Sequence, residues 1–294
     1  MHYLTRKIKD LSEQDKHTIM TELLDIIAEP PITQADQIQL VLMADFTNDA
    51  KERVENFGKM QGLSSGYPSI DELTKGFVPG ELTVLAGKTS YGKTTVAMNI
   101  ANRVVLAGKR VLFVTMEMTH VELTSRYMYI NGGETEDYQY VAANTVFQKN
   151  DELNWQSIDG LIRHAKEDMQ VDLVIVDHLH YFTRELENVA EDLGRITKEL
   201  KKNAQRHKVA IILISHVRKT FKDQAATMED LRGSSYIAQD ADIVLMVGRD
   251  PQDSSTIHVK VEKNRNRGFD HNNPVAILNF NNTKITERGK IDSQ

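Results

Sequence analysis

One eight-residue stretch, Gly87-Lys88-Thr89-Ser90-Tyr91-Gly92-Lys93-Thr94, constrains the fold of this chain more than any other feature. It follows an apolar run at 82–86 and opens a helical pattern at 94–107. The two glycines let the backbone turn so that its amides face an anion, and the start of the helix adds positive potential. Strand, turn and helix in this order predict a P-loop, or Walker A motif, that cradles the phosphates of a nucleotide.

The chemistry of such a cradle assigns a task to each polar residue. We expect Lys93 to neutralise the β- and γ-phosphates and the Thr94 hydroxyl to hold Mg²⁺. Asp177 ends the apolar run LVIVD, which is where the second magnesium carboxylate belongs. The predicted cofactors are therefore ATP, or another NTP, and Mg²⁺, with Thr94 and Asp177 as metal ligands. The predicted nucleotide-binding residues are Gly87, Lys88, Thr89, Ser90, Tyr91, Gly92, Lys93, Thr94 and Asp177.

Two further polar residues follow apolar runs. Glu117 comes just after VLFVT, where a carboxylate can polarise an attacking water, although an ordinary polar residue at a strand exit looks the same. His216 closes the run IILIS at the carboxyl edge, where parallel sheets bind ligands. It is a candidate sensor of the γ-phosphate, or a structural histidine.

His178 and His180 flank Asp177 at a spacing that places two side chains on one face of a strand. No third ligand follows at a suitable spacing, so the sequence argues against a dedicated transition-metal site.

Apolar runs alternate with helical patterns from about residue 66 onward, which predicts an α/β fold with a mainly parallel sheet covered on both faces. The expected strands are 82–86, 111–115, 173–177, 210–215 and 243–247, with an antiparallel extension at 257–261 and 275–280. The expected helices are 94–107, 119–130, 152–169, 188–207 and 229–240, and 131–150 is interpreted as a loop.

The first 60 residues have a different pattern from the rest. Two helical patterns, 11–28 and 34–58, are separated by Pro30 and Pro31, and the second carries an apolar stripe that needs a partner surface. We therefore predict a short helical N-terminal segment at 1–60 and a main domain at 61–294.

Composition narrows the class of protein without naming a partner. The chain has 294 residues and no cysteine, which excludes disulfides and thiolate zinc sites and is typical of a reducing compartment. The N-terminus does not resemble a secretory signal, and the apolar runs are too short to cross a bilayer. The net charge of −6 argues weakly against nucleic acid, but local basic clusters decide such binding.

Six motifs in order resemble the motor domain of the DnaB-type replicative helicases over roughly residues 60–285. They are SSGYPSIDELTKGFVPGELTVLAGKTSYGKTTVAMNIA, VLFVTMEM, LVIVDHLHY, IILISHVRK, DLRGSSYIAQDADIVLMVGRD and VEKNRNRG. The resemblance implies a RecA-like P-loop ATPase that works as a ring of six subunits, hydrolyses ATP and unwinds DNA during replication in the 5′ to 3′ direction. It also implies a cytoplasmic protein of a bacterial or phage-infected cell.

The same resemblance assigns catalytic roles. Lys93, Glu117, His216 and Asp177 would act from one subunit, while Lys263 and Arg265 would reach the γ-phosphate bound to the next subunit. A cation supplied across the interface stabilises the charge that develops in the transition state. In a single copy, the same two residues would look like a basic strand end in solvent.

Single-stranded DNA is the partner that the family implies, bound in a central channel. The residues that match the channel loops are Arg218, Lys219, Lys222, Arg232, Gly233 and Ser235. Long cationic side chains and a glycine that permits close backbone approach bind phosphates without reading bases, as a translocating motor requires.

The chain also departs from the family pattern. DnaB-type proteins carry a larger N-terminal helical domain that forms a collar and meets primase, whereas about 60 residues precede the motor here. The helix at 34–58 is expected to serve as a linker helix, and primase or a helicase loader remains a partner by analogy only. His216 stands where bacterial members often carry Gln, which resembles the phage-type branch.

Two other functions fit some of the same residues. A RadA-type DNA-remodelling ATPase is compatible with KNR followed by Gly268, but DLRGSS favours the helicase and such proteins usually carry a zinc module. A non-catalytic subunit that uses nucleotide as an assembly switch need not keep Lys93, Glu117, Asp177 and Arg265.

Overall fold

The computed structural model describes residues 42–56, 59–148, 157–177, 189–217, 235–265 and 274–291. The chain divides into two compact units, Met1–Glu55 and Asn56–Gln294. In the first unit, a short 3-10 helix, η2 (Met43–Phe46), leads into α3 (Thr47–Glu55). The apolar side chains of Leu42, Met43 and Val54 are exposed there. The helix expected at 11–28 and the start of the one expected at 34–58 lie outside the described residues.

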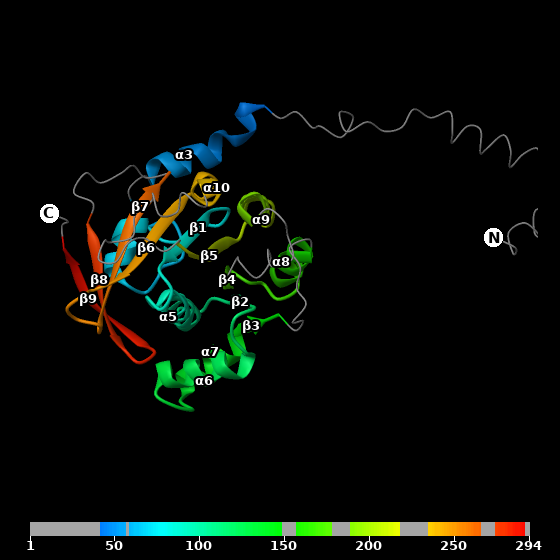
Figure 1. The fold of residues 1–294 in the computed structure, drawn as a ribbon. Coiled ribbons are helices and arrows are strands. Elements are labelled where there is room, and N and C mark those ends of the chain that lie inside the picture. The colour runs from blue at the N-terminus through cyan, green and yellow to red at the C-terminus, as the bar shows by residue number, and fades with distance from the viewer. Residues whose placement is uncertain are drawn as a thin grey trace, which may run out of the picture. The chain divides into compact units, whose positions relative to one another are not determined.

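The second unit is built on one nine-stranded sheet with the order β3-β2-β4-β5-β1-β6-β7-β8-β9 (Figure 1). The strands from β3 to β6 run parallel, and β7, β8 and β9 extend the sheet antiparallel. Their bounds are β1 (Leu82–Gly87), β2 (Val111–Thr115), β3 (Thr145–Phe147), β4 (Leu173–Asp177), β5 (Ala210–His216), β6 (Ile243–Arg249), β7 (Thr256–Asn264), β8 (Val275–Asn281) and β9 (Lys284–Ile291). The predicted α/β fold class is confirmed.

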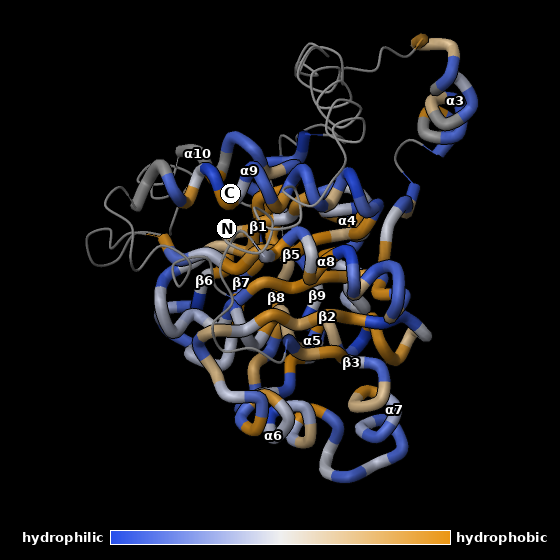
Figure 2. The backbone as a smooth tube through the Cα atoms, turned by 90° about the vertical axis from the view of Figure 1, so that its right-hand side faces the viewer, coloured by the Kyte–Doolittle hydropathy of each residue, from blue (hydrophilic) through white to orange (hydrophobic). Residues whose placement is uncertain are grey.

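Helices cover both faces of this sheet. The helices of the unit are α4 (Pro68–Thr74), α5 (Lys93–Leu106), α6 (His120–Asn131), α7 (Glu136–Asn144), α8 (Ile158–Glu167), α9 (Val189–His207) and α10 (Ser235–Asp240). Along β1, Leu85 packs into the core on the side of α5, whereas Val84 and Ala86 pack on the side of α8 and α9. Burial on both faces explains why the central strands are apolar throughout, as the orange tube in Figure 2 shows.

The interpretation of 131–150 as a loop was wrong, because this stretch forms α7 and β3. Thr135 caps α7 by accepting a hydrogen bond from the Tyr138 amide at 3.2 Å, and only Val141 of the helix is fully buried. One buried residue leaves no periodic apolar pattern to detect. The short helix α4 and the edge strand β9 were likewise not predicted; in β9, Ile285 is buried among mostly exposed residues.

The register of the parallel strands decides where the polar strand ends meet. Gly87 at the end of β1 lies opposite His216 of β5 and Val247 of β6, and Thr115 of β2 lies opposite Asp177 of β4. A Cβ on Gly87 would stand 2.5 Å from the carbonyl oxygen of Val247, so only glycine fits there. The carboxyl edge of the sheet therefore gathers the cradle and its expected partners.

Candidate functional site

The cradle begins as the sequence predicts, with a tight turn between β1 and α5. Ser90 and Gly92 both have positive φ, 67° and 89°, which places Gly92 in the left-handed conformation at the start of α5. The Tyr91 amide donates to the Lys88 carbonyl at 3.3 Å and closes the turn. The next helix therefore starts with its unpaired amides at the loop, the arrangement that binds phosphate.

Lys93 and His216 meet inside this cradle. The Lys93 ammonium donates to the Lys88 carbonyl at 2.9 Å and contacts His216 Nδ1 at 3.0 Å. Thr89 Oγ1 lies 3.4 Å from the same ring nitrogen. Burial lowers the pKa of Lys93 to about 8, although the nearby carboxylates of Asp177 and Glu117 oppose this shift. The structure thus joins the expected phosphate-binding lysine to the expected sensor residue.

Asp177 carries a buried carboxylate that has no hydrogen-bond partner for either oxygen among the described residues. It is 1% exposed, and burial raises its pKa from the ordinary 3.8 to about 7. The neighbouring Thr94 hydroxyl lowers this pKa, although no hydrogen bond of ordinary geometry joins it to the carboxylate, and the negative charge of Glu117 raises it. Hard divalent cations prefer oxygen ligands, and an unpartnered buried carboxylate beside a hydroxyl fits such an ion. Thr94 and Asp177 are therefore suitable residues to hold Mg²⁺.

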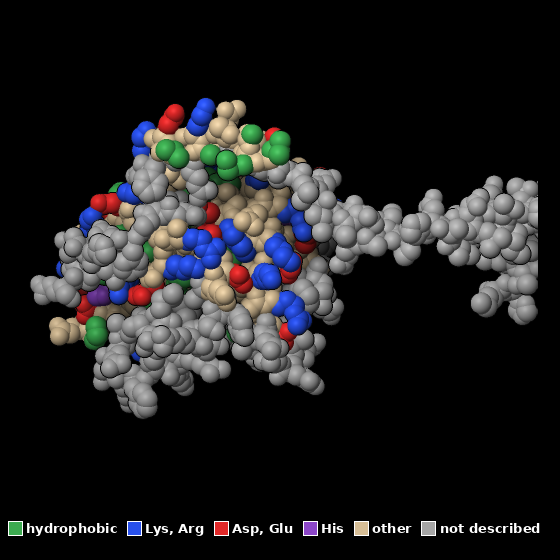
Figure 3. All heavy atoms as spheres, turned by 90° about the horizontal axis from the view of Figure 1, so that it is seen from above, with side chains coloured by type: hydrophobic (Ala, Val, Ile, Leu, Met, Phe, Trp, Pro, Cys, Tyr) green, Lys and Arg blue, Asp and Glu red, His purple; other side chains and the backbone are tan. Residues whose placement is uncertain are grey.

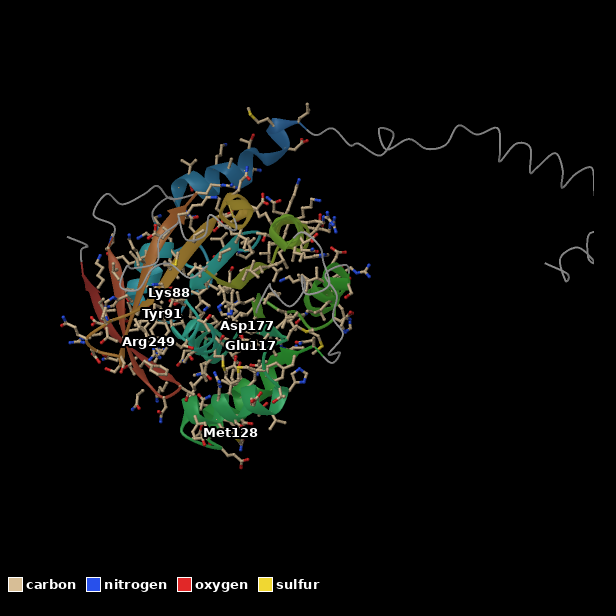
Figure 4. The ribbon with its side chains drawn as sticks, in the orientation of Figure 1. Lys88, Tyr91, Glu117, Met128, Asp177 and Arg249 are labelled. Atoms are coloured by element: carbon tan, nitrogen blue, oxygen red, sulfur yellow. The ribbon has the colours of Figure 1, made fainter. Side chains whose placement is uncertain are left out.

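Glu117 lies beside Asp177, as Figure 4 shows. It stands in the turn after β2, which is fixed in two ways: the Met116 amide donates to the Asp177 carbonyl at 3.0 Å, and the Met118 amide to Thr115 Oγ1 at 3.3 Å. Unlike Asp177, Glu117 is exposed. An exposed carboxylate next to the metal-ligand position is accessible to a water molecule, which suits a base better than a metal ligand.

A buried glutamine that the sequence did not single out supports the same turn. The Gln148 side chain accepts a hydrogen bond from the Thr115 amide at 3.1 Å and donates to the Thr115 carbonyl. It thus continues the pairing of β2 beyond β3. No sequence signal pointed to it, because Gln148 lies within the stretch 131–150 that was interpreted as a loop.

Arg249 is a second residue that sequence reasoning missed. It ends β6, and its guanidinium lies 4.5 Å over the ring of Phe280 and donates to the Ser254 carbonyl at 3.0 Å. A Cβ on Gly92 would lie 3.9 Å from the Arg249 side chain, and Figure 4 shows Arg249 beside Lys88 and Tyr91. A cation stacked on an aromatic ring at the mouth of the cradle offers a flat surface to a base. The signal was a charged residue at a strand end, in VGRD.

The structure separates Lys263 and Arg265 from this group. Parallel pairing puts Ile243 of β6 opposite Thr83 near the start of β1, and antiparallel pairing puts Asn264 opposite Ile243. The two cations therefore lie at the amino edge of the sheet. Four residues of β6, on the order of 13 Å, separate this edge from the level of Gly87. They are half-exposed at this edge and also bound to the protein, because both donate to the Gln239 carbonyl, at 3.1 and 2.7 Å.

The other predicted site residues lie largely outside the described residues. This holds for Arg218, Lys219, Lys222, Arg232 and Gly233. His178 and His180, where the sequence argues against a metal site, also lie outside the described residues. Ser235 is the first residue of α10. Within the described ranges, no group of three or more His, Cys, Asp and Glu side chains could hold a metal ion, and no helix is long and apolar enough to cross a membrane.

The basic cluster on α9 is partly neutralised by acidic neighbours. Lys201 contacts Asp242 at 2.6 Å, Lys202 contacts Glu199 at 2.6 Å, and Arg206 contacts Asp159 at 2.6 Å. Figure 3, which looks down on this end of the molecule, shows Lys and Arg side chains gathered with Asp and Glu among them. This cluster is therefore a helix face held by ion pairs.

Comparison with known proteins places this site in a family. The model of the AAA domain family matches residues 51–221, more than half of the chain. The chain belongs to the AAA domain family. The replicative DNA helicase DnaB of Geobacillus stearothermophilus is 24% identical over 293 residues, a match that covers 89% of this chain and 61% of that protein. The resemblance to DnaB-type helicases that the six motifs indicated is confirmed.

Solved structures agree on the fold. One solved ATPase domain superposes with a TM-score of 0.72 at 20% identity, over 85% of this chain and 99% of that one. A DnaB-like replicative helicase, solved in a study of its interactions with primase, superposes with a TM-score of 0.70 at 18% identity, over 93% and 76% of the two chains. Both are RecA-like ATPase folds. The chain spans about half to three fifths of the length of the curated relatives it matches.

Burial of the Asp177 carboxylate is expected to make the stability of the folded protein depend on pH when nucleotide and metal are absent. Because the folded-state pKa lies near 7 and the ordinary value is 3.8, the folded state binds more protons than the unfolded state between these values. Stability should therefore fall as pH rises from about 4 to 7. Asp177→Asn removes this ionisation, so its melting temperature should exceed that of the parent by a margin that grows between pH 5 and pH 7.5.

The measurement is thermal unfolding of both proteins in metal-free buffer across that range. A constant difference between the two melting temperatures would show that the pKa of Asp177 in the folded protein lies outside this range. Added Mg²⁺ with nucleotide should reverse the order, since only the parent carboxylate binds the cation.

Proposed function

We propose that this protein is an ATP-driven replicative helicase motor that works as a ring, most simply a homo-hexamer. It moves along single-stranded DNA and separates the duplex in the 5′ to 3′ direction. The observation that carries the proposal is the division of the catalytic groups between opposite edges of one sheet. Lys93, Asp177 and His216 lie at the carboxyl edge, while Lys263 and Arg265 lie at the amino edge, on the order of 13 Å away along β6. A pocket completed by two copies is the arrangement that uses both sets.

Each residue then has a defined task in ATP hydrolysis. The amides of the cradle and Lys93 bind the phosphates, and on binding Lys93 exchanges its contact with the Lys88 carbonyl for phosphate oxygens. Mg²⁺ held by Thr94 and Asp177 would neutralise charge on the β- and γ-phosphates. Glu117 accepts a proton from the attacking water, and His216, beside Lys93, is placed to contact the γ-phosphate. Arg265 and Lys263 of the adjoining copy stabilise the charge that develops on the transferred group.

The base of the nucleotide is proposed to stack on Arg249. The pair formed by Arg249 and Phe280 stands at the mouth of the cradle, next to Gly92. Stacking of this kind tolerates different bases, so we expect ATP to be the main substrate because it is abundant, with weak discrimination against other NTPs.

The DNA strand is proposed to bind through Arg218, Lys219, Lys222, Arg232, Gly233 and Ser235. The helix at 34–58 would serve as the linker helix, because the exposed Leu42, Met43 and Val54 need an apolar partner. Primase or a loader remains a candidate partner by analogy with the DnaB-like relatives, and the compartment is proposed to be the cytoplasm of a bacterial or phage-infected cell.

Two rival functions predict different behaviour. A RadA-type remodeller shares the fold and would hydrolyse ATP without separating a forked duplex by strand exclusion. A nucleotide-switched subunit would bind ATP without turnover, but Glu117 beside Asp177 is an arrangement that such a subunit does not need.

Forked DNA and Glu117→Gln together test the motor. We expect the parent protein to assemble into a ring by native mass and to separate the strands of a fork only with Mg²⁺ and ATP. Glu117→Gln should keep nucleotide affinity but lose hydrolysis by about 10²–10⁴-fold, because proton removal from water fails while the cradle survives. Unchanged hydrolysis in this variant would remove Glu117 from its role. Turnover without strand separation would favour the remodeller.

Mixed rings test the composite pocket. Arg265→Ala and Lys93→Ala should each abolish hydrolysis in pure form, since each removes one half of every pocket. In an equal random mixture, about a quarter of the interfaces pair an intact cradle with an intact Arg265. The mixture should therefore regain a measurable fraction of the parent ATPase rate. A mixture that exchanges subunits and stays as inactive as its components would argue that both residues act within one copy.

Arg249→Ala tests the base platform. Removing a stacking partner costs on the order of 1–3 kcal/mol per base, so KM for ATP should rise about tenfold with little change in kcat. Arg110→Ala, which alters an arginine next to the amino end of β2, is the matched control and should leave KM unchanged. Inorganic triphosphate, which has no base, should bind Arg249→Ala and the parent equally well. Equal KM for ATP in the variant and the parent would rule out the platform.

A further inference from the structure

Lys263 and Arg265 are held by a structure that the sequence motifs do not describe. The two side chains converge on one acceptor, the main-chain carbonyl of Gln239, at 3.1 and 2.7 Å. Gln239 belongs to the last turn of α10 (Ser235–Asp240), where unpaired carbonyls and the helix dipole favour cations. An irregularity in the β6–β7 pairing contributes to the position of these side chains. Val244 pairs with Lys263 but Leu245 pairs with Val261, so β7 has one extra residue between them. The extra residue re-aims the end of β7 towards α10.

Asp242 contacts Arg265 at two further points. Its carboxylate lies 3.7 Å from the Arg265 guanidinium, and its carbonyl accepts from the Arg265 amide at 2.8 Å. Both the side chain and the backbone of Arg265 are therefore tied to one residue. The carboxylate is 4% exposed, whereas the Arg265 side chain is 49% exposed. A buried anion beneath a half-exposed cation leaves the outer edge of the guanidinium available to a further acceptor.

The same carboxylate is rigidly placed from the other side. One oxygen accepts from the Leu82 amide at 2.8 Å and from the Lys201 ammonium at 2.6 Å, and Lys201 also donates to the Gly80 carbonyl at 2.8 Å. Asp242 thus bridges the start of β1, the middle of α9 and the tip of β7. Because every one of these contacts is short and partly or fully buried, the carboxylate cannot follow Arg265 if the arginine moves.

We propose that Asp242 is a positioning residue for the catalytic cations. It aims Arg265 out of the amino edge of the sheet towards the nucleotide of an adjoining copy. Together with the Gln239 carbonyl, it aims Lys263 in the same direction. This inference rests on the proposed function, since it gives Asp242 a role in a pocket that two copies complete. Preorganised cations reduce the reorganisation needed when charge develops in the transition state. Loss of Asp242 should therefore lower kcat and leave KM for ATP nearly unchanged.

Asp242 also contacts β1, which carries the cradle, so an effect within the same copy is the alternative. Mixed rings separate the two. If Asp242 acts through Arg265, an Asp242→Asn subunit keeps an intact cradle, and a Lys93→Ala neighbour supplies an intact Arg265. If Asp242 acts through Leu82 and β1, the Asp242→Asn cradle is itself defective, and no neighbour can restore it.

The experiment measures ATPase rates of pure and mixed rings. Asp242→Asn alone should lower kcat at least tenfold, and an equal mixture with Lys93→Ala should rise well above the mean of its two components. Asp168→Asn makes the same chemical change at an exposed carboxylate at the end of α8, leaves the Asp242–Arg265 contact in place and should keep at least half of the parent kcat. Native mass and melting temperature confirm assembly of every variant.

Asp242→Asn leaves Lys201 without its counter-charge and risks poor folding, so the double variant Asp242→Asn/Lys201→Gln provides the same test without a buried unpaired lysine. An unchanged kcat, or a loss in both variants that Lys93→Ala subunits do not restore, would overturn the inference. The mixture of Arg265→Ala with Lys93→Ala shows whether only the role of Asp242 fails or the proposed function fails as well. If that mixture recovers activity while the Asp242 mixtures do not, the composite pocket stands and Asp242 acts on its own cradle.

Discussion

Parallel pairing of β1 with β5 and β6 decides where the functional groups of this protein lie. Parallel strands share a direction, so polar residues that follow apolar runs all arrive at one edge of the sheet, as Gly87, His216 and Asp177 do. The turn to antiparallel pairing at β7 reverses this, because the end of β7 returns to the edge where β1 begins. A single change of strand direction therefore sends two basic residues to the edge opposite the cradle, where another copy would use them in the proposed ring.

This arrangement buries two charged groups whose desolvation is only partly offset by favourable interactions. Lys93 and Asp177 both have a pKa displaced towards the neutral form, the lysine down to about 8 and the aspartate up to about 7. Desolvation is the leading cause in each case, and their mutual attraction offsets only part of it. Such a site is less stable alone than with an anion and a cation bound, so ligand binding and stability are coupled at the same two residues.

The sequence predicted elements that bury a continuous run and missed elements with few or no buried residues, such as α7 and β3. β2 and β4 match their predicted bounds, because five consecutive buried residues leave a clear pattern. α7 was missed, because Val141 is its only fully buried residue. In the site, the Walker motif identified Lys93 and Thr94 through fixed spacing. Arg249 and Asp242 were not identified, because their roles depend on neighbours far along the chain, Phe280 and Arg265, that only the folded sheet brings near.

The pairing of β6 with β7 joins the two ends of the proposed mechanism. Arg249, at one end of this pair, stands beside the cradle of its own copy, and Arg265, just beyond the other end, lies at the opposite edge of the sheet. β6 and β7 are paired along their length, with Arg249 at one end of the pair and Asn264 at the other. The paired strands therefore cannot easily absorb a displacement of either end. Asp242, at the start of β6, ties the far end to β1 as well. In the proposed ring, the same hairpin would contact one nucleotide and present cations to the next, so that ring would need no separate element to connect neighbouring sites.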